Sequence, residues 1–182
     1  MNKDILIKIP SLIVYPRRYF NDVIDSNSFK LKDVVWLGLG IVVIFTILHI
    51  FQYNIFDYFK DMLSSGIYLG AFMLGIAVSF AFKTYFITTA LQKTGVDVNY
   101  RKAGMVVCTA MIPGMVLLFL SLVFQAKEYY DQVDIVIRLW NYLLLVIGIS
   151  VISGVRWTKI ALLILVMYGY MLMIEFAFAG MF

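Results

Sequence analysis

Three ionisable residues, His49, Lys83 and Glu175, lie inside or next to long apolar stretches of this sequence. Ionisable side chains are costly within a membrane, and those found there commonly carry protons or ions. At ~1.5 Å per residue, His49 and Glu175 lie about 24 and about 27 Å from the starts of their apolar segments. The two side chains could therefore pair at a similar depth, whereas Lys83 is expected near the opposite interface. This arrangement gives a transport hypothesis.

Structural roles also account for the three residues, and we favour them. The Lys83 side chain is expected to extend its ammonium group to the lipid headgroups. Glu175 is expected at the outer interface, and His49 inside the protein with its hydrogen bonds satisfied. Few polar residues lie at membrane depths between those of Lys83 and the two residues His49 and Glu175. The sequence therefore offers little support for a proton relay across the membrane.

Catalytic and metal-binding arrangements are missing from the sequence. The chain has one His and one Cys, Cys108, which excludes an internal disulfide framework and a cysteine zinc site. No cluster of His, Cys and carboxylate residues has the spacing of metal ligands, and no nucleophile–base pair or phosphate-binding loop is visible. We therefore expect no catalytic residue, no metal and no cofactor.

The composition points to a membrane protein. Of the 182 residues, 63% are hydrophobic and 14% are charged, and the mean hydropathy is +0.91. Soluble domains are nearer about half apolar and about a quarter charged, so an ordinary cytosolic enzyme is excluded. The net charge is +4, but the basic residues lie between apolar blocks and not in one groove, which argues against nucleic acid as a partner.

Five apolar segments predict an all-α, polytopic fold with five transmembrane helices. The last apolar run, 139–182, would be ~66 Å long as one helix, about twice the hydrocarbon thickness. It must therefore fold back, and the turn is expected at Ser153-Gly154-Val155-Arg156. Long continuous runs favour helices over barrel strands. The predicted transmembrane domain, 34–182, contains helices at about 34–53, 66–91, 103–124, 137–153 and 157–178.

The distribution of basic residues predicts the orientation. Most of the fifteen Lys and Arg residues fall in the N-terminal segment, the second connection and the last turn, which share one side of a five-span protein. Basic residues favour the cytoplasmic side, so the N-terminus is expected there and the C-terminus on the far side. Trp36, Trp140 and Trp157 each lie near the start of a predicted helix, where interfacial aromatic residues are common.

Residues 1–33 form a predicted cytoplasmic amphipathic segment. Behind Pro16, a short helix would place Tyr19 and Phe20 on an apolar face and Arg17 and Arg18 largely on the opposite face. Such a helix could lie in the headgroup plane and bind anionic lipid. We favour the simpler alternative, in which it packs onto the cytoplasmic end of the bundle.

Small residues indicate where helices approach closely. In the second predicted helix Gly66, Gly70, Ala77 and Ala81 share one stripe, which is typical of helix–helix contacts in membranes. Pro113 lies inside the third predicted helix and should kink it. Such kinks occur both at transport cavities and in plain bundles.

The order of these features resembles the Yip family of five-span membrane proteins, named for interaction with Ypt/Rab GTPases. The resemblance covers about 10–182. It rests on Pro16 with Tyr19 and Phe20, the basic connection with Lys93-Thr94-Gly95 and Tyr100-Arg101-Lys102-Ala103, Pro113, and the final hairpin. Thr94-Gly95 stands where paired glycines are typical, and the N-terminal segment is short, which favours a bacterial-type relative. The resemblance implies a non-enzymatic role in membrane organisation or trafficking.

We therefore expect a non-enzymatic protein of the cytoplasmic (inner) bacterial membrane that binds lipids or other integral membrane proteins, in some cases as a subunit of a larger complex. Its expected contact surfaces are the small-residue stripe and the basic face formed by Arg17, Arg18, Lys93, Arg101 and Lys102. The alternative is a small transporter or permease accessory subunit with a cavity near Pro113, His49 and Glu175.

Overall fold

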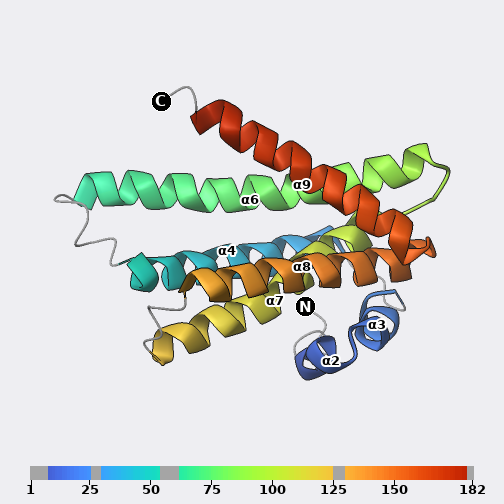
Figure 1. The fold of residues 1–182 in the computed structure, drawn as a ribbon, viewed down its shortest axis with the longest axis horizontal. Coiled ribbons are helices and arrows are strands. Elements are labelled where there is room, and N and C mark those ends of the chain that lie inside the picture. Colours follow the sequence, from blue (N-terminus) through green and yellow to red (C-terminus); the bar gives the residue numbers. More distant parts are fainter. Residues whose placement is uncertain (1–7, 26–29, 54–61, 125–129, 180–182) are drawn as a thin grey trace.

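The computed structural model describes residues 8–25, 30–53, 62–124 and 130–179, and every regular element in these ranges is a helix. The all-α prediction is therefore confirmed for the part of the chain that the structure describes. The elements, drawn in Figure 1, are α2 (Ile9–Val14), α3 (Pro16–Tyr19), the π-helical turn η1 (Phe20–Asp25), α4 (Leu31–Tyr53), α6 (Met62–Lys93), α7 (Tyr100–Val123), α8 (Tyr130–Ser153) and α9 (Trp157–Ala179).

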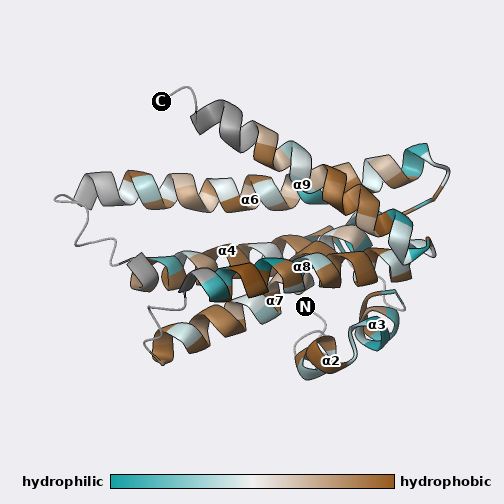
Figure 2. Ribbon diagram, in the orientation of Figure 1, coloured by the Kyte–Doolittle hydropathy of each residue, from teal (hydrophilic) through white to brown (hydrophobic). Residues whose placement is uncertain are grey.

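Four of the helices are long and apolar enough to cross a membrane. The qualifying stretches are Leu31–Phe51, Gly66–Lys93, Tyr100–Val123 and Gln132–Ser153. In Figure 2 the brown of hydrophobic residues predominates over much of α7 and α8, as expected of helices in an integral membrane protein. The fifth apolar stretch, Trp157–Met173, is shorter within the described residues, so a fifth span stays a prediction.

Helix α7 forms the centre of the molecule. It contacts α8, α4, α6 and η1, whereas α9 contacts α8 and α6 (Figure 1). In the apolar stretch that makes α7 a candidate membrane span, 56% of the residues are buried inside the protein. In the corresponding stretch of α6, 11% are buried. Helix α6 therefore lies at the edge of the bundle and keeps most of its surface for other contacts.

Three glycines let α7 approach its neighbours. A Cβ atom at Gly104 would lie 2.8 Å from Val34 Cγ1 on α4, and one at Gly114 would lie 2.7 Å from Ile137 Cγ2 on α8. On α8, a Cβ atom at Gly148 would lie 2.5 Å from Val106 Cγ1 of α7. Real Cβ contacts do not come so close, so these positions require glycine.

The N-terminal elements pack against the bundle. Elements α3 and η1 contact α8, and η1 also contacts α7. The side chains of Tyr19, Phe20, Val23 and Ile24, together with that of Leu12 in α2, are buried. Helix α2 was not expected from the sequence.

The two ends of α8 show how local contacts set its bounds. Helix α8 begins at Tyr130, earlier than the predicted 137. An ion pair of 2.7 Å between Asp134 Oδ2 and Arg138 Nε, one turn apart, joins the added part to the predicted helix. The helix ends at the expected turn, where Gly154 has a φ of 67°, a conformation that favours glycine. Ser150 Oγ donates a hydrogen bond of 2.7 Å to the Val155 carbonyl across this turn.

Replacing Gly148 by alanine is expected to destabilise the protein by about 1–3 kcal/mol, because the new methyl group would overlap Val106 and Phe20. Gly40→Ala in α4 is the matched control, since a Cβ atom there meets nothing within 4 Å. That control should leave stability unchanged or raise it by up to about 1 kcal/mol. Thermal unfolding in detergent measures the difference, and equal melting temperatures for the two variants would contradict this packing.

Candidate functional site

Basic residues from three separate segments meet at one end of the bundle. Figure 1 shows the connection from α6 to α7, the turn from α8 to α9, and helix α3 at the same end of the molecule. The first contributes Lys93 and Arg101, the second Arg156, and the third Arg17 and Arg18. These five side chains are classed as exposed, so this end presents a cationic surface.

An ion pair ties the N-terminal segment to this end. Lys102 Nζ, at the start of α7, lies 2.8 Å from Asp25 Oδ1 at the end of η1 and also donates to the Asp25 backbone carbonyl. Both side chains are partly buried, so the pair is shielded from solvent to some extent. Lys102 was expected to bind a partner or lipid. The structure gives it a contact within the chain, and its binding to a partner or lipid stays a prediction.

Tyr19 and Phe20 are placed in the core of the protein. Their exposed fractions are 1% and 0%, and their rings meet edge to face with centroids 5.6 Å apart. The Phe20 ring reaches Gly148 on α8. Burial raises the pKa of the Tyr19 hydroxyl, so the phenol stays neutral. This placement favours the packing role of the segment over direct contact of these rings with lipid.

The connection from α6 to α7 is a compact basic turn. Gly95 has a φ of 82°, and its backbone N–H donates to the Gln92 carbonyl, which closes the end of α6. Asn99 begins α7 by accepting a hydrogen bond of 2.8 Å from the Arg101 N–H. These two caps hold Lys93 and Arg101 at the exposed end of the bundle.

A cavity of about 1100 Å³ opens between the N-terminal segment and the end of α8. Residues of α3 and η1 form one wall, and residues of α8 and the α8–α9 turn form the other. The lining residues are Val14, Tyr15, Pro16, Arg17, Arg18, Asn21, Asp22, Ile147, Ser150, Val151, Gly154, Val155, Arg156 and Trp157.

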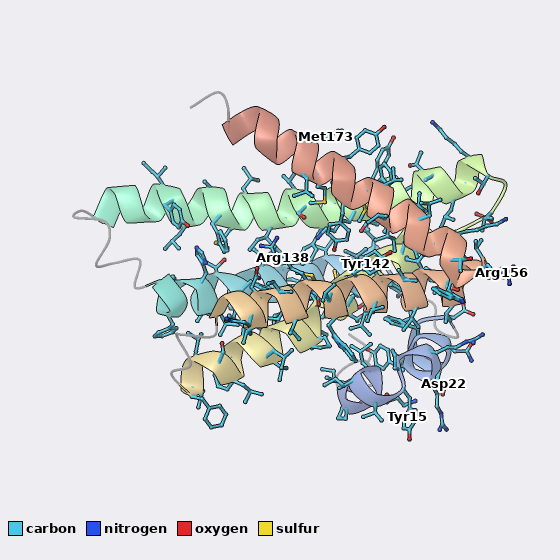
Figure 3. The ribbon with its side chains drawn as sticks, viewed as in Figure 1. Tyr15, Asp22, Arg138, Tyr142, Arg156 and Met173 are labelled. Atoms are coloured by element: carbon cyan, nitrogen blue, oxygen red, sulfur yellow. The ribbon has the colours of Figure 1, made fainter. Side chains whose placement is uncertain are left out.

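The cavity has a cationic rim and an apolar wall. Its lining contains three arginines and one aspartate, and Figure 3 shows Arg156 and Asp22 at the same end of the molecule. Arg18 Nε lies 3.4 Å from Asp22 Oδ2. Within the part of the chain that the structure describes, no hydrogen bond or ion pair is formed by the side chain of Arg17 or Arg156. Their guanidinium donors are therefore available to an anion.

The small-residue stripe lies on the outside of the bundle. Gly66, Gly70, Ala77 and Ala81 are all exposed along α6. A Cβ atom at Gly66 or Gly70 would meet nothing within 4 Å. No neighbour within the described residues uses the close approach that these positions allow.

The three intramembrane ionisable residues are not brought together by the described contacts. His49 Nε2 lies 2.9 Å from Tyr68 Oη, and its ring stacks on Phe72 with centroids 4.0 Å apart, so it packs against α6. The Glu175 side chain lies outside the described residues, and its pairing with His49 stays a prediction. Lys83 is buried, with Nζ 5.5 Å from the centre of the Tyr168 ring. This burial argues against the expected extension of Lys83 to the headgroups.

Pro113 lies inside α7, which is helical on both sides of it. Its side chain is buried, and the next residue, Gly114, faces Ile137 and Asn141 of α8. Asn141 Oδ1 is buried and has no hydrogen-bond partner among the described residues. The kink at Pro113 stays a prediction, and the cavity at the basic end includes neither Pro113 nor His49.

Sequence reasoning missed Arg156 and Trp157 as site residues, although it placed both at the final turn. A tight glycine turn followed by an arginine and an interfacial tryptophan is a usable signal for a headgroup contact. Comparisons of the chain with protein-family models, with curated proteins and with solved structures each give no match.

Proposed function

We propose that this chain is a non-enzymatic, five-span integral membrane protein that binds other membrane components in membrane organisation, as the resemblance to the Yip family suggests. Its N-terminus and its basic end would face the cytoplasm of a bacterial cell, and its C-terminus would face the periplasm. Its partners would be lipids and other integral membrane proteins, with the chain acting alone or as a subunit of a complex.

The meeting of the three basic segments at one end of the bundle is the observation that best supports this proposal (Figure 1). Five spans starting in the cytoplasm require the N-terminal segment, the α6–α7 connection and the α8–α9 turn to share a side. An excess of Lys and Arg on that side agrees with the cytoplasmic preference of basic residues. The two acidic residues in the sequence of α8, Asp131 and Asp134, belong to its first two turns, at its other end.

The exposed face of α6 supports contact with other membrane proteins. Apolar burial gives helices little drive to associate in lipid, so contacts there depend on backbones that approach closely. Gly66 and Gly70 permit such an approach and are unused within the described chain. A partner helix could therefore pack along this stripe without displacing any described contact.

The transporter alternative has less support. It needs a cavity shared by Pro113, His49 and Glu175, but His49 packs on Tyr68 and Phe72 of α6. The residue after Pro113 faces α8. The cavity that the structure shows lies at the basic end instead.

Reporters fused to the two ends of the chain test the topology. A fluorescent protein that matures only in the cytoplasm should be active at the N-terminus and dark at the C-terminus, and alkaline phosphatase should give the opposite pattern. The physical reason is that basic connections are retained in the cytoplasm. Activity of one reporter at both ends would contradict a five-span protein.

Leucine substitutions test the α6 stripe. Gly70→Leu is expected to reduce the amount of protein recovered in complexes several-fold, because a bulky side chain prevents close backbone approach. Gly40→Leu on α4, another position with nothing within 4 Å of a Cβ atom, is the matched control and should have no effect. Mild-detergent purification with mass spectrometry of co-eluting proteins makes the measurement. A solitary wild-type monomer, or equal losses for both variants, would contradict this surface.

A further inference from the structure

The cavity between α3 and the α8–α9 turn changes in polarity along its length. Arg156 and Gly154 lie at the end of α8, where the chain reverses, whereas Val151 and Ile147 lie progressively deeper along the helix. Ile147 is about 9 Å along the helix axis from Ser153, the last residue of α8, at ~1.5 Å per residue. Trp157, a residue type common at the membrane interface, borders the same cavity.

The two walls present arginines to the same space. Arg17 comes from α3, and Arg156 comes from the turn before α9. A guanidinium group has five N–H donors in a planar fork, which matches the oxygens of a phosphate. Because Arg18 is engaged by Asp22, Arg17 and Arg156 are the main candidates for binding an anion here.

The size and lining of the cavity favour a lipid over a small anion. A volume of about 1100 Å³ is at the upper end of ligand pockets, well beyond the needs of an inorganic ion. The apolar wall formed by Ile147, Val151 and Trp157 offers a free phosphate no favourable contact, but it can contact acyl chains. The ligand should therefore carry a negative headgroup next to hydrocarbon.

We propose that this cavity is a binding site for one anionic phospholipid of the leaflet at the basic end. The phosphate lies between Arg17 and Arg156, and the upper part of an acyl chain follows Val151 and Ile147 along α8. The bound lipid fills the space between the N-terminal segment and the end of α8. This inference deepens the proposed function, because it places a specific lipid at the end that we propose to be cytoplasmic.

Native mass spectrometry of the full-length protein released from nanodiscs tests the site. The nanodiscs contain phosphatidylcholine with a minor fraction of phosphatidylglycerol, and the number of retained phosphatidylglycerol molecules is counted. Wild-type protein should retain phosphatidylglycerol in preference to phosphatidylcholine. Arg17→Gln and Arg156→Gln should each lower that retention about tenfold, as expected for loss of a charge-assisted contact.

Lys159→Gln is the matched control, because Lys159 is an exposed cation in the first turn of α9 that does not line the cavity. It removes the same charge and should change retention by less than about twofold, since exposed charges act weakly. Equal losses for Lys159→Gln and Arg156→Gln would show general attraction between charges and would overturn the proposal. Displacement of the lipid by equimolar soluble glycerol phosphate would overturn it too, because the headgroup alone would then suffice.

Val151→Trp provides a test that leaves every charge in place. The larger side chain fills the apolar part of the cavity and should abolish selective retention, with an unchanged melting temperature as evidence of folding. Selective retention by a folded Val151→Trp variant would overturn the proposed acyl contact. Both leaflets of a nanodisc have the same composition, so lipid retention does not depend on how the protein is oriented in the cell. The lipid site and the proposed topology can therefore be confirmed or contradicted separately.

Discussion

Helices in a bilayer gain little from burying apolar side chains against one another, because the surrounding lipid is equally apolar. Their association depends on close contact, and in this protein α7 provides it. Gly104 and Gly114 of α7 bring it against α4 and α8, and Gly148 of α8 completes the second contact. The order of the other helices follows from this arrangement, with α4, α6 and α8 around α7 and α9 beyond them.

The same close contact positions the candidate site. Gly148 leaves room for the Phe20 ring, which anchors η1 to α8, and the ion pair between Lys102 and Asp25 anchors it to α7. Two attachments to different helices hold α3 beside the end of α8. The cavity at the basic end is therefore a product of the packing in the core, since its two walls belong to segments more than a hundred residues apart in sequence.

Continuous apolar runs were sufficient to predict where the long helices lie, because only helices satisfy their own backbone in lipid. The turn at Gly154 was predicted from the length of the last run, since one helix would have been too long for a membrane. The start of α8 was harder to predict, because its N-terminal part contains the polar residues Asp134 and Arg138, which stabilise the helix by pairing with each other.

The site was predicted less well, for reasons that particular residues illustrate. An apolar helix face looks the same whether it meets lipid or protein, so the sequence left two roles open for Tyr19 and Phe20. The depth of Lys83 suggested a path to the headgroups, but its contact with Tyr168 depends on how α6 and α9 pack. The cavity escaped prediction because Arg17 and Arg156 meet only in the folded chain.

Helix α6 has a further consequence for how the protein responds to its surroundings. Its 32 residues would extend about 48 Å, well beyond a hydrocarbon core of ~30 Å. In the proposed membrane placement it must tilt or project from the surface. The buried side chains of α6 lie in its second half, between Phe80 and Leu91, so tilting disturbs the fewest contacts at the Gly66 end. A thinner bilayer would increase the tilt and move the Gly66 end sideways relative to the rest of the bundle. The lateral position of Gly66 and Gly70 would thus vary with hydrophobic mismatch.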